Sequence, residues 1–160
     1  VGLGLFLLTW IYYAYAKGDL QPKEGEGLVR RWEKLPYSLH DGMVTQLTWE
    51  GQGLWLSFDY GYLEIMGEEC VQVEGDVCLR EVEEQNSWIF LWKKGEKTWE
   101  GEKHNLGWLM AQEGYLEIQE ETYGENLSCF SGLYSFGEEV LDFELHICHS
   151  GPMEYRLRGE

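Results

Sequence analysis

The feature of the sequence that most constrains the fold is an alternation of apolar and polar side chains with a period of two residues. It is clearest in VLDFELHICHSG at residues 140–151, and it recurs at 54–59 and 153–158. Successive side chains of a β-strand point to opposite faces of a sheet, so this alternation predicts antiparallel strands with one buried face and one polar face. In the first stretch, the side chains expected in the core are Phe143, Leu145 and Ile147.

Short turn sequences separate these runs. The chain contains 20 Gly and 3 Pro, and signals such as EGQG at 50–53 and HSGP at 149–152 fall between the alternating segments. Aromatic residues reach 15%, so few side chains are needed to fill a core. Strands at this spacing predict a mainly β fold, an antiparallel sandwich or a partly open barrel of about eight to ten short strands, with at most one or two short helices.

The sequence divides into three parts. Residues 1–16 are apolar and uncharged, residues 17–34 form a polar, glycine-bearing linker, and residues 35–160 form a single β-rich domain. A spanning helix needs roughly 20 apolar residues, so the first segment is interpreted as a truncated membrane anchor, a signal remnant or a core strand. We expect a cytoplasmic domain, tethered to a membrane only if residues 1–16 are an anchor. If that segment spans a membrane, the Lys and Arg residues after it place the rest of the chain in the cytoplasm.

The net charge of −17 is concentrated in the β-rich part. Residues 17–34 hold five basic and four acidic residues, whereas residues 35–160 hold seven basic and 25 acidic ones. A surface of this sign repels the phosphates of nucleic acids and of anionic lipid headgroups. The acidity therefore predicts a well-solvated domain that does not bind nucleic acid and whose attraction is for a basic protein.

Two interpretations stay open for residues 70–82, which form either one long strand or a hairpin that turns at Glu74-Gly75. The hairpin brings Cys70 and Cys78 together, whereas a single strand holds them more than about 20 Å apart.

The four cysteines, at 70, 78, 129 and 148, contain no C-x-x-C pair. A domain of this size needs no disulfide, so we expect free and mostly buried thiols.

Two interpretations also stay open for residues 103–114. The sequence KHNLGWLMAQEG favours a short helix, with Asn105 as its N-cap and Gly114 just after its end. However, WEGQGLWLSFDYGYLEI at 49–65 resembles WEGEKHNLGWLMAQEGYLEI at 99–118, since both begin with WEG and end with GYLEI. Such an internal repeat indicates a duplicated strand–turn–strand unit, in which residues 107–112 are a strand.

The segment that starts with SLHDG at 38–42 carries one resemblance. Together with MVTQLTW and LWLSFDYGY, it resembles small bacterial β-rich domains of unknown function. The resemblance covers about 25 residues and implies an all-β or α+β fold, and it implies no activity.

Residues of the polar row in 140–151 are candidates for a metal site. Consecutive residues on one strand face lie about 6.6 Å apart, so His146 and Cys148 could share an ion with a residue on the neighbouring strand. Further candidate ligands are Cys129, His149 and His40. The spacing matches no metal-binding motif, and the preferred interpretation is a solvent-facing row. The pair His40-Asp41 is expected to be part of a turn at Asp41-Gly42. The sequence contains no phosphate loop or dinucleotide fingerprint, so no cofactor is predicted.

Aromatic residues provide the candidate ligand-binding side chains. Trp88 and Trp92 lie in a strand that is apolar on both faces, which predicts burial in the core. Trp55 shares its face with polar residues and is expected to be exposed, where it could stack on a sugar or contact a basic side chain. The predicted ligand-binding residues are Trp55, Asp59, Tyr60 and Tyr62.

These observations favour a non-enzymatic binding module with an acidic surface that recognises a basic protein, in the manner of a bacterial immunity protein that neutralises a toxin. Two alternatives remain. One is a β-domain that binds carbohydrate or another small ligand through exposed aromatic residues. The other is a metal-dependent enzyme built around His146, Cys148 and His40.

Overall fold

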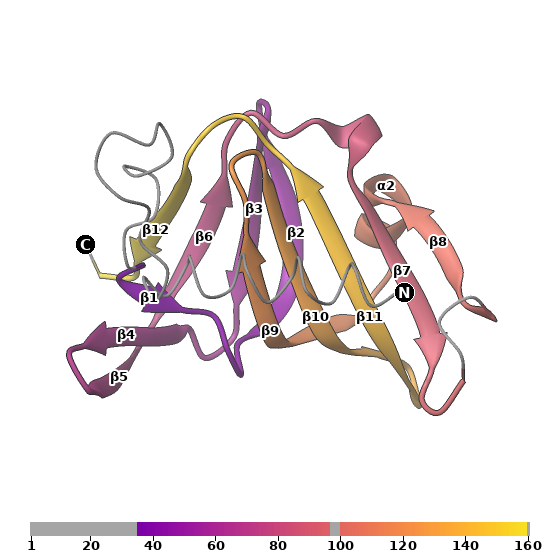
Figure 1. Cartoon of the computed structure of the whole chain (residues 1–160), viewed down its shortest axis with the longest axis horizontal. Coiled ribbons are helices and arrows are strands. Elements are labelled where there is room, and N and C mark those ends of the chain that lie inside the picture. The colour runs from indigo at the N-terminus through magenta and orange to yellow at the C-terminus, as the bar shows by residue number, and fades with distance from the viewer. Residues whose placement is uncertain (1–34, 97–99, 160) are drawn as a thin grey trace, which may run out of the picture.

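The structure is a computed structural model, and it describes residues 35–96 and 100–159. These residues form two antiparallel sheets, one of nine strands and one of three (Figure 1). The predicted mainly β fold is confirmed, and the larger sheet is open because its two edge strands do not pair with each other. The apolar segment 1–16 and the linker 17–34 lie outside the described residues.

Figure 1 shows the strands of the larger sheet side by side across the molecule. Their order is β12 (Met153–Leu157), β6 (Gly75–Leu79), β3 (Gly53–Phe58), β2 (Met43–Glu50), β9 (Tyr115–Tyr123), β10 (Leu127–Phe136), β11 (Glu139–Cys148), β7 (Trp88–Lys93) and β8 (Glu102–Asn105). The smaller sheet consists of β1 (Tyr37–Ser38), β4 (Tyr62–Met66) and β5 (Glu69–Val73). The described helical segments are the 3₁₀ turn η2 (Glu84–Asn86) and the short helix α2 (Leu106–Met110).

One face of the nine-stranded sheet carries the hydrophobic core. Phe143, Leu145 and Ile147 of β11 are buried, as the alternation predicts. β11 pairs with β10 along the full length of both strands, so the apolar rows of the two strands share a face. Burial of one such side chain contributes about 1.5–3 kcal/mol to stability. The opposite row, from Asp142 to Cys148, is half-buried rather than fully exposed to solvent as expected.

Both interpretations of residues 70–82 are wrong, because the chain crosses from one sheet to the other at Glu74. β5 pairs with β4 in the smaller sheet, whereas β6 pairs with β3 and β12 in the larger one. The crossing is tight, since a Cβ added to Gly75 would lie 2.6 Å from the hydroxyl of Tyr62. Cys70 is therefore exposed in one sheet while Cys78 is buried in the other. All four cysteines are free thiols, as expected, but only Cys78 is fully buried.

The predicted short helix within residues 103–114 is confirmed with Asn105 as its N-cap, but it ends at Met110, four residues before Gly114; the strand interpretation of residues 107–112 is wrong. The side chain of Asn105 caps α2 by accepting a hydrogen bond of 2.7 Å from the backbone N–H of Trp108. Leu106 and Leu109 of α2 are buried in the core. The two similar segments therefore differ locally, since Trp108 lies in a helix whereas Trp55 lies in β3.

A buried carboxylate joins the segment before β2 to the larger sheet. Glu121 of β9 is 2% exposed, and it accepts hydrogen bonds from the backbone N–H of Leu39 at 2.6 Å and from the hydroxyl of Ser38 at 3.0 Å. The predicted turn at Asp41-Gly42 follows directly, with the N–H of Gly42 bonded to the carbonyl of Leu39 at 2.9 Å. These bonds fix the point at which the chain enters β2.

A buried histidine fixes the connection between β11 and β12. Nδ1 of His149 donates to the carbonyl oxygen of Gly151 at 2.8 Å, and Nε2 lies 2.7 Å from the hydroxyl of Ser128, which makes it the acceptor in a neutral ring. Burial lowers the pKa of His149 below its ordinary value of 6.5.

We predict that Glu121→Ala destabilises the domain by about 1–3 kcal/mol, because the buried N–H of Leu39 loses its acceptor. Urea denaturation would measure the change. Glu138→Ala, at the exposed turn between β10 and β11, is the matched control and should change stability by less than about 0.5 kcal/mol. Equal effects of the two substitutions would contradict the role of Glu121.

We also predict that the free energy of unfolding decreases as the pH falls below about 6.5, because the unfolded chain takes up a proton that the folded state resists at His149. The stabilisation is complete above the pKa of the unfolded state and is lost as the pH approaches the lower folded-state pKa. His149→Asn keeps a donor but does not titrate, so its stability should vary less between about pH 7.5 and 5.5. Identical pH slopes for the two proteins would show that His149 is not responsible.

Candidate functional site

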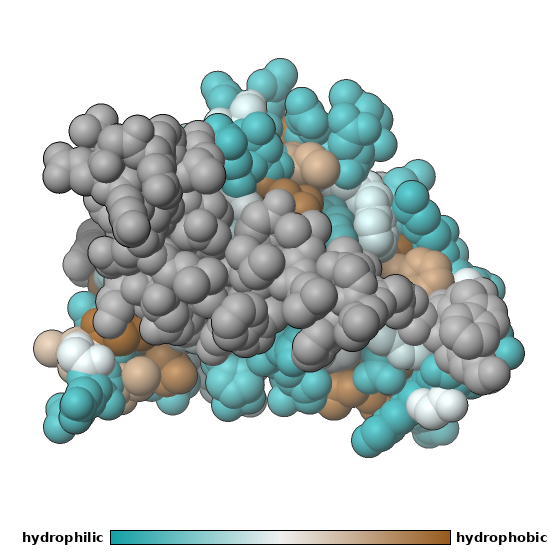
Figure 2. All heavy atoms as spheres, in the orientation of Figure 1, coloured by the Kyte–Doolittle hydropathy of each residue, from teal (hydrophilic) through white to brown (hydrophobic). Residues whose placement is uncertain are grey.

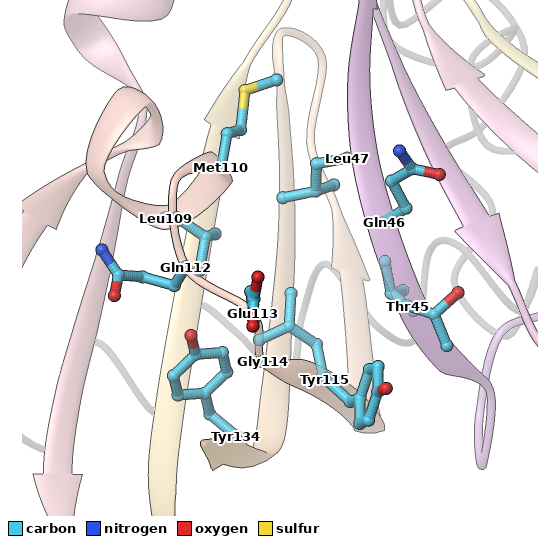
Figure 3. Close-up of a pocket in the computed structure, with 12 residues that line it drawn as sticks. Thr45, Gln46, Leu47, Leu109, Met110, Gln112, Glu113, Gly114, Tyr115 and Tyr134 are labelled. Carbon is cyan, nitrogen blue, oxygen red and sulfur yellow. The ribbon is translucent and has the colours of Figure 1, made fainter. Parts of the chain in front are cut away.

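The described residues contain a cleft at the place where β2 and β9 separate. The two strands pair only at Met43↔Glu117 and Val44↔Leu116. Beyond Val44, β2 continues with β3 as its partner, and α2 packs against β2, β7 and β8 beside the gap. The result is a cleft of about 560 Å³ between α2, β2 and the start of β9 (Figure 3).

The cleft has an apolar wall and several polar groups. Figure 3 shows Tyr134 and Gln112 on one side, Thr45 and Gln46 on the other, and Glu113 between them. Among the described residues that line the cleft, Glu113 is the only charged one. The apolar wall consists of Val44, Leu47, Leu109, Met110 and Leu116.

Tyr134 is the unusual side chain of this site. It is 2% exposed, yet its hydroxyl has no hydrogen-bond partner. Burial raises the pKa of Tyr134, so the phenol stays protonated at neutral pH. Gly114 makes room for the ring, because a Cβ at that position would lie 2.4 Å from the phenol carbons and oxygen. A buried hydroxyl without a partner costs about 1–3 kcal/mol, which a ligand in the cleft could recover.

The carboxylate of Glu113 is also available to a ligand. Glu113 is exposed at the cleft and has neither an ion pair nor a hydrogen bond from its side chain within the part of the chain that the structure describes. Tyr115, which follows two residues later, is 51% exposed and presents an aromatic ring at the same place. The cleft thus combines an unneutralised negative charge, an unpaired hydroxyl, an aromatic ring and an apolar wall.

The structure buries Trp55, so the expectation that this side chain is exposed is wrong. Trp55 is 8% exposed because two arginines cover it, with the guanidinium carbons of Arg156 and Arg80 at 4.2 and 5.7 Å from the ring centroid. Its indole N–H donates to Glu50 at 2.7 Å. The predicted contact between Trp55 and a basic side chain exists, but it forms within the chain itself.

The other predicted ligand-binding residues do not form a single surface with Trp55. Asp59 and Tyr60 are exposed in the turn between β3 and β4, where Tyr60 reaches 62% exposure. Tyr62 is buried, and its hydroxyl donates to the backbone carbonyl of Asp76 at 3.1 Å.

Of the predicted metal ligands, His146 and Cys148 lie on the same face of β11, whereas His40 lies in another part of the fold. His146 stacks on Trp88 at 4.0 Å between ring centroids, and its Nδ1 lies 3.4 Å from the Sγ of Cys129. His40 instead lies in the turn before β2, at 3.7 Å from the carboxylate of Asp41. Within residues 35–96 and 100–159, no group of three or more His, Cys, Asp or Glu side chains is arranged to hold a metal ion.

The contact between Cys129 and His146 has the residue types of a nucleophile and its base. Burial raises the pKa of the Cys129 thiol to about 12, so the sulfur is protonated at neutral pH. The S–H can then donate to Nδ1, which directs the Nε2–H towards Glu144. Nε2 lies 3.1 Å from the Glu144 carboxylate, but the alignment is too poor for a hydrogen bond. This cluster is therefore a packed polar row without an activated thiolate.

Comparison of the chain with protein-family models, with curated proteins and with solved structures gave no match. Among the described residues, no helix has the length and hydrophobicity needed to cross a membrane. The resemblance of residues 38–62 to small bacterial domains therefore stays a prediction.

The sequence did not indicate the residues of the cleft. Tyr134 occupies an apolar position of β10 and looks like any other core side chain, while Glu113 is one of many carboxylates. The one local signal is Gly114, which lies in the segment between α2 and β9 and provides the space for the ring of Tyr134.

We predict that the four thiols differ in reactivity towards iodoacetamide at about pH 8. Cys70 is exposed and should react first, whereas Cys78 and Cys129, whose thiol pKa values are raised by burial, should be protected in the folded protein. Peptide mass spectrometry after brief labelling would give the order. If Cys129 were labelled as fast as Cys70, the thiol would be more acidic and more accessible than this structure indicates.

Proposed function

We propose that this protein is a non-enzymatic binding domain whose acidic surface recognises a basic protein partner. The observation that carries the proposal is the uneven distribution of charge at one end of the larger sheet. We call this region the acidic end and define it by six carboxylates at the end of β2, in the connections there and near the start of β12: Glu50, Glu81, Glu83, Glu84, Glu125 and Glu154.

Backbone hydrogen bonds hold the loops of the acidic end together. The N–H of Val82 donates to Gln52 at 2.9 Å, that of Glu83 donates to Cys148 at 2.8 Å, and that of His149 donates to Asn126 at 3.1 Å. Figure 2 shows hydrophilic side chains gathered at the top of the view, where Figure 1 places the turn between β2 and β3. The carboxylates are therefore presented by a fixed set of loops rather than by separate ones.

The arginines of the domain already contact side chains of the domain itself. Arg80, the only Lys or Arg in loops 50–53, 80–87, 123–127 and 148–152, lies 3.0 Å from Glu154 and 4.0 Å from Glu50. Arg156 covers Trp55, and Arg158 lies 3.0 Å from Asp76. Glu81, Glu83 and Glu84 have no Lys or Arg partner among the described residues, and they produce a negative field that would attract a basic partner and accelerate its association. An antagonist of a basic toxin, as immunity proteins are, fits this size and charge.

The cleft favours a second candidate function, the binding of a small molecule. Its volume of about 560 Å³ falls within the range of roughly 300–1,000 Å³ that is usual for small-molecule sites. Carbohydrate binding on the predicted aromatic residues has less support, because Trp55 and Tyr62 are buried.

Selection of the folded protein against a displayed library of random peptides would test the primary proposal. We expect the enriched peptides to carry Lys or Arg and to bind more weakly as the salt concentration rises, since surface charges are screened. The triple variant E81Q/E83Q/E84Q should weaken such a peptide about tenfold, at roughly 0.5 kcal/mol for each exposed pair.

The matched control is E68Q/E69Q/E74Q, which removes the same charge from exposed positions around β5. It should change the affinity less than twofold. Enrichment of neutral or acidic peptides, or equal weakening by the two triple variants, would contradict the proposal.

A further inference from the structure

We propose that the cleft between α2, β2 and β9 receives one arginine or lysine side chain of the partner. This inference rests on the proposed function, because it assigns the contact that gives the acidic surface its specificity. Long-range attraction brings a basic partner to the surface, but a defined pocket is needed to distinguish one basic protein from another.

The negative charge of the cleft favours a ligand that carries a positive charge. Glu113 is the only charged side chain among the described residues that line the cleft, and no cation of the described chain neutralises it. An anionic ligand would meet repulsion here, whereas a guanidinium or ammonium group would meet attraction.

The unpaired hydroxyl of Tyr134 offers a hydrogen-bond acceptor to the guanidinium or ammonium group of the partner's side chain. Its oxygen lies inside the molecule with no donor to accept from and no acceptor to bond to. The N–H groups of a guanidinium or ammonium donate but cannot accept, so they suit both this oxygen and the carboxylate of Glu113. The ring of Tyr115 is 51% exposed, so a cation can bind against its face.

The apolar wall suits the stem of the same side chain. Lys and Arg carry three or four methylene groups below the charged head, and they bury this stem along apolar surface when they can. Leu47, Leu109 and Met110 provide such a surface beside the polar groups. A short polar side chain would leave this wall in contact with water, and an apolar side chain would leave Glu113 and Tyr134 unpaired.

The test measures binding of a basic peptide, taken from the selection described above, to four proteins by fluorescence polarisation. We expect Glu113→Gln to weaken binding about tenfold and Tyr134→Phe about threefold to tenfold, through the loss of one charged and one neutral hydrogen bond. Glu138→Gln at the exposed turn between β10 and β11 is the control and should bind like the wild type. Replacing the critical arginine of the peptide with citrulline, which keeps its shape and removes its charge, should weaken binding about tenfold.

Tyr134→Phe has a second readout that separates binding from folding. Because the hydroxyl has no partner in the free protein, its removal should leave the thermal unfolding midpoint unchanged or higher. A variant that binds more weakly and yet is at least as stable as the wild type identifies a ligand contact. Lower stability together with weaker binding would show that the hydroxyl supports the fold instead.

The remaining outcomes distinguish this inference from the proposed function. If the acidic-end variant weakens the peptide but Glu113→Gln and Tyr134→Phe do not, the inference about the cleft is wrong and the proposed function stands. If no peptide containing Lys or Arg binds, the proposed function fails. If N-acetyl-arginine amide or a neutral small molecule occupies the cleft as tightly as the peptide, the occupant is a free small molecule and the assignment to a partner's side chain is wrong.

Discussion

The register between β9, β10 and β11 is the constraint on which the rest of the structure depends. Alternate residues of each strand face opposite sides, so a slip of one residue would move Phe143 and Leu145 out of the core and His146 into it. The long pairing of β10 with β11 fixes this choice along the full length of both strands. The same register places Tyr134 on the inner face, next to the cleft, and places Cys129 opposite His146 on the outer face.

The basic and the acidic side chains of this domain are placed differently. Its arginines are used internally, where Arg156 and Arg80 cover Trp55 and Arg158 contacts Asp76. One carboxylate, that of Glu121, is buried with three hydrogen-bond donors, since the hydroxyl of Tyr123 also bonds to it at 3.1 Å. Most other carboxylates are left at the surface. The excess negative charge therefore does little to hold the fold together and is available for association.

The sequence alone predicted the structural features that depend on residues close together in the chain. The two-residue alternation predicted the buried row of β11, Asn105 predicted the start of α2, and Asp41-Gly42 predicted a turn. The sequence was insufficient where distant segments meet. Trp55 is buried because Arg156, one hundred residues later, lies over it. Nothing local at Glu74 indicates that the chain changes sheets there, and the cleft exists only because β2 and β9 separate after a short pairing.

That short pairing also affects how the larger sheet can move. Between the group of four strands and the other five, β2 and β9 share two paired positions and the bonds of Asp41 and Gly42 with Ile118, and the buried Glu121 and the loops of the acidic end add further bonds. The ladder at this junction is much shorter than the ladder between β10 and β11. The cleft lies at this junction, so its width follows the angle between the two halves. A molecule held there would contact β2 on one side and α2 and β9 on the other, and so would restrain the angle between the two halves.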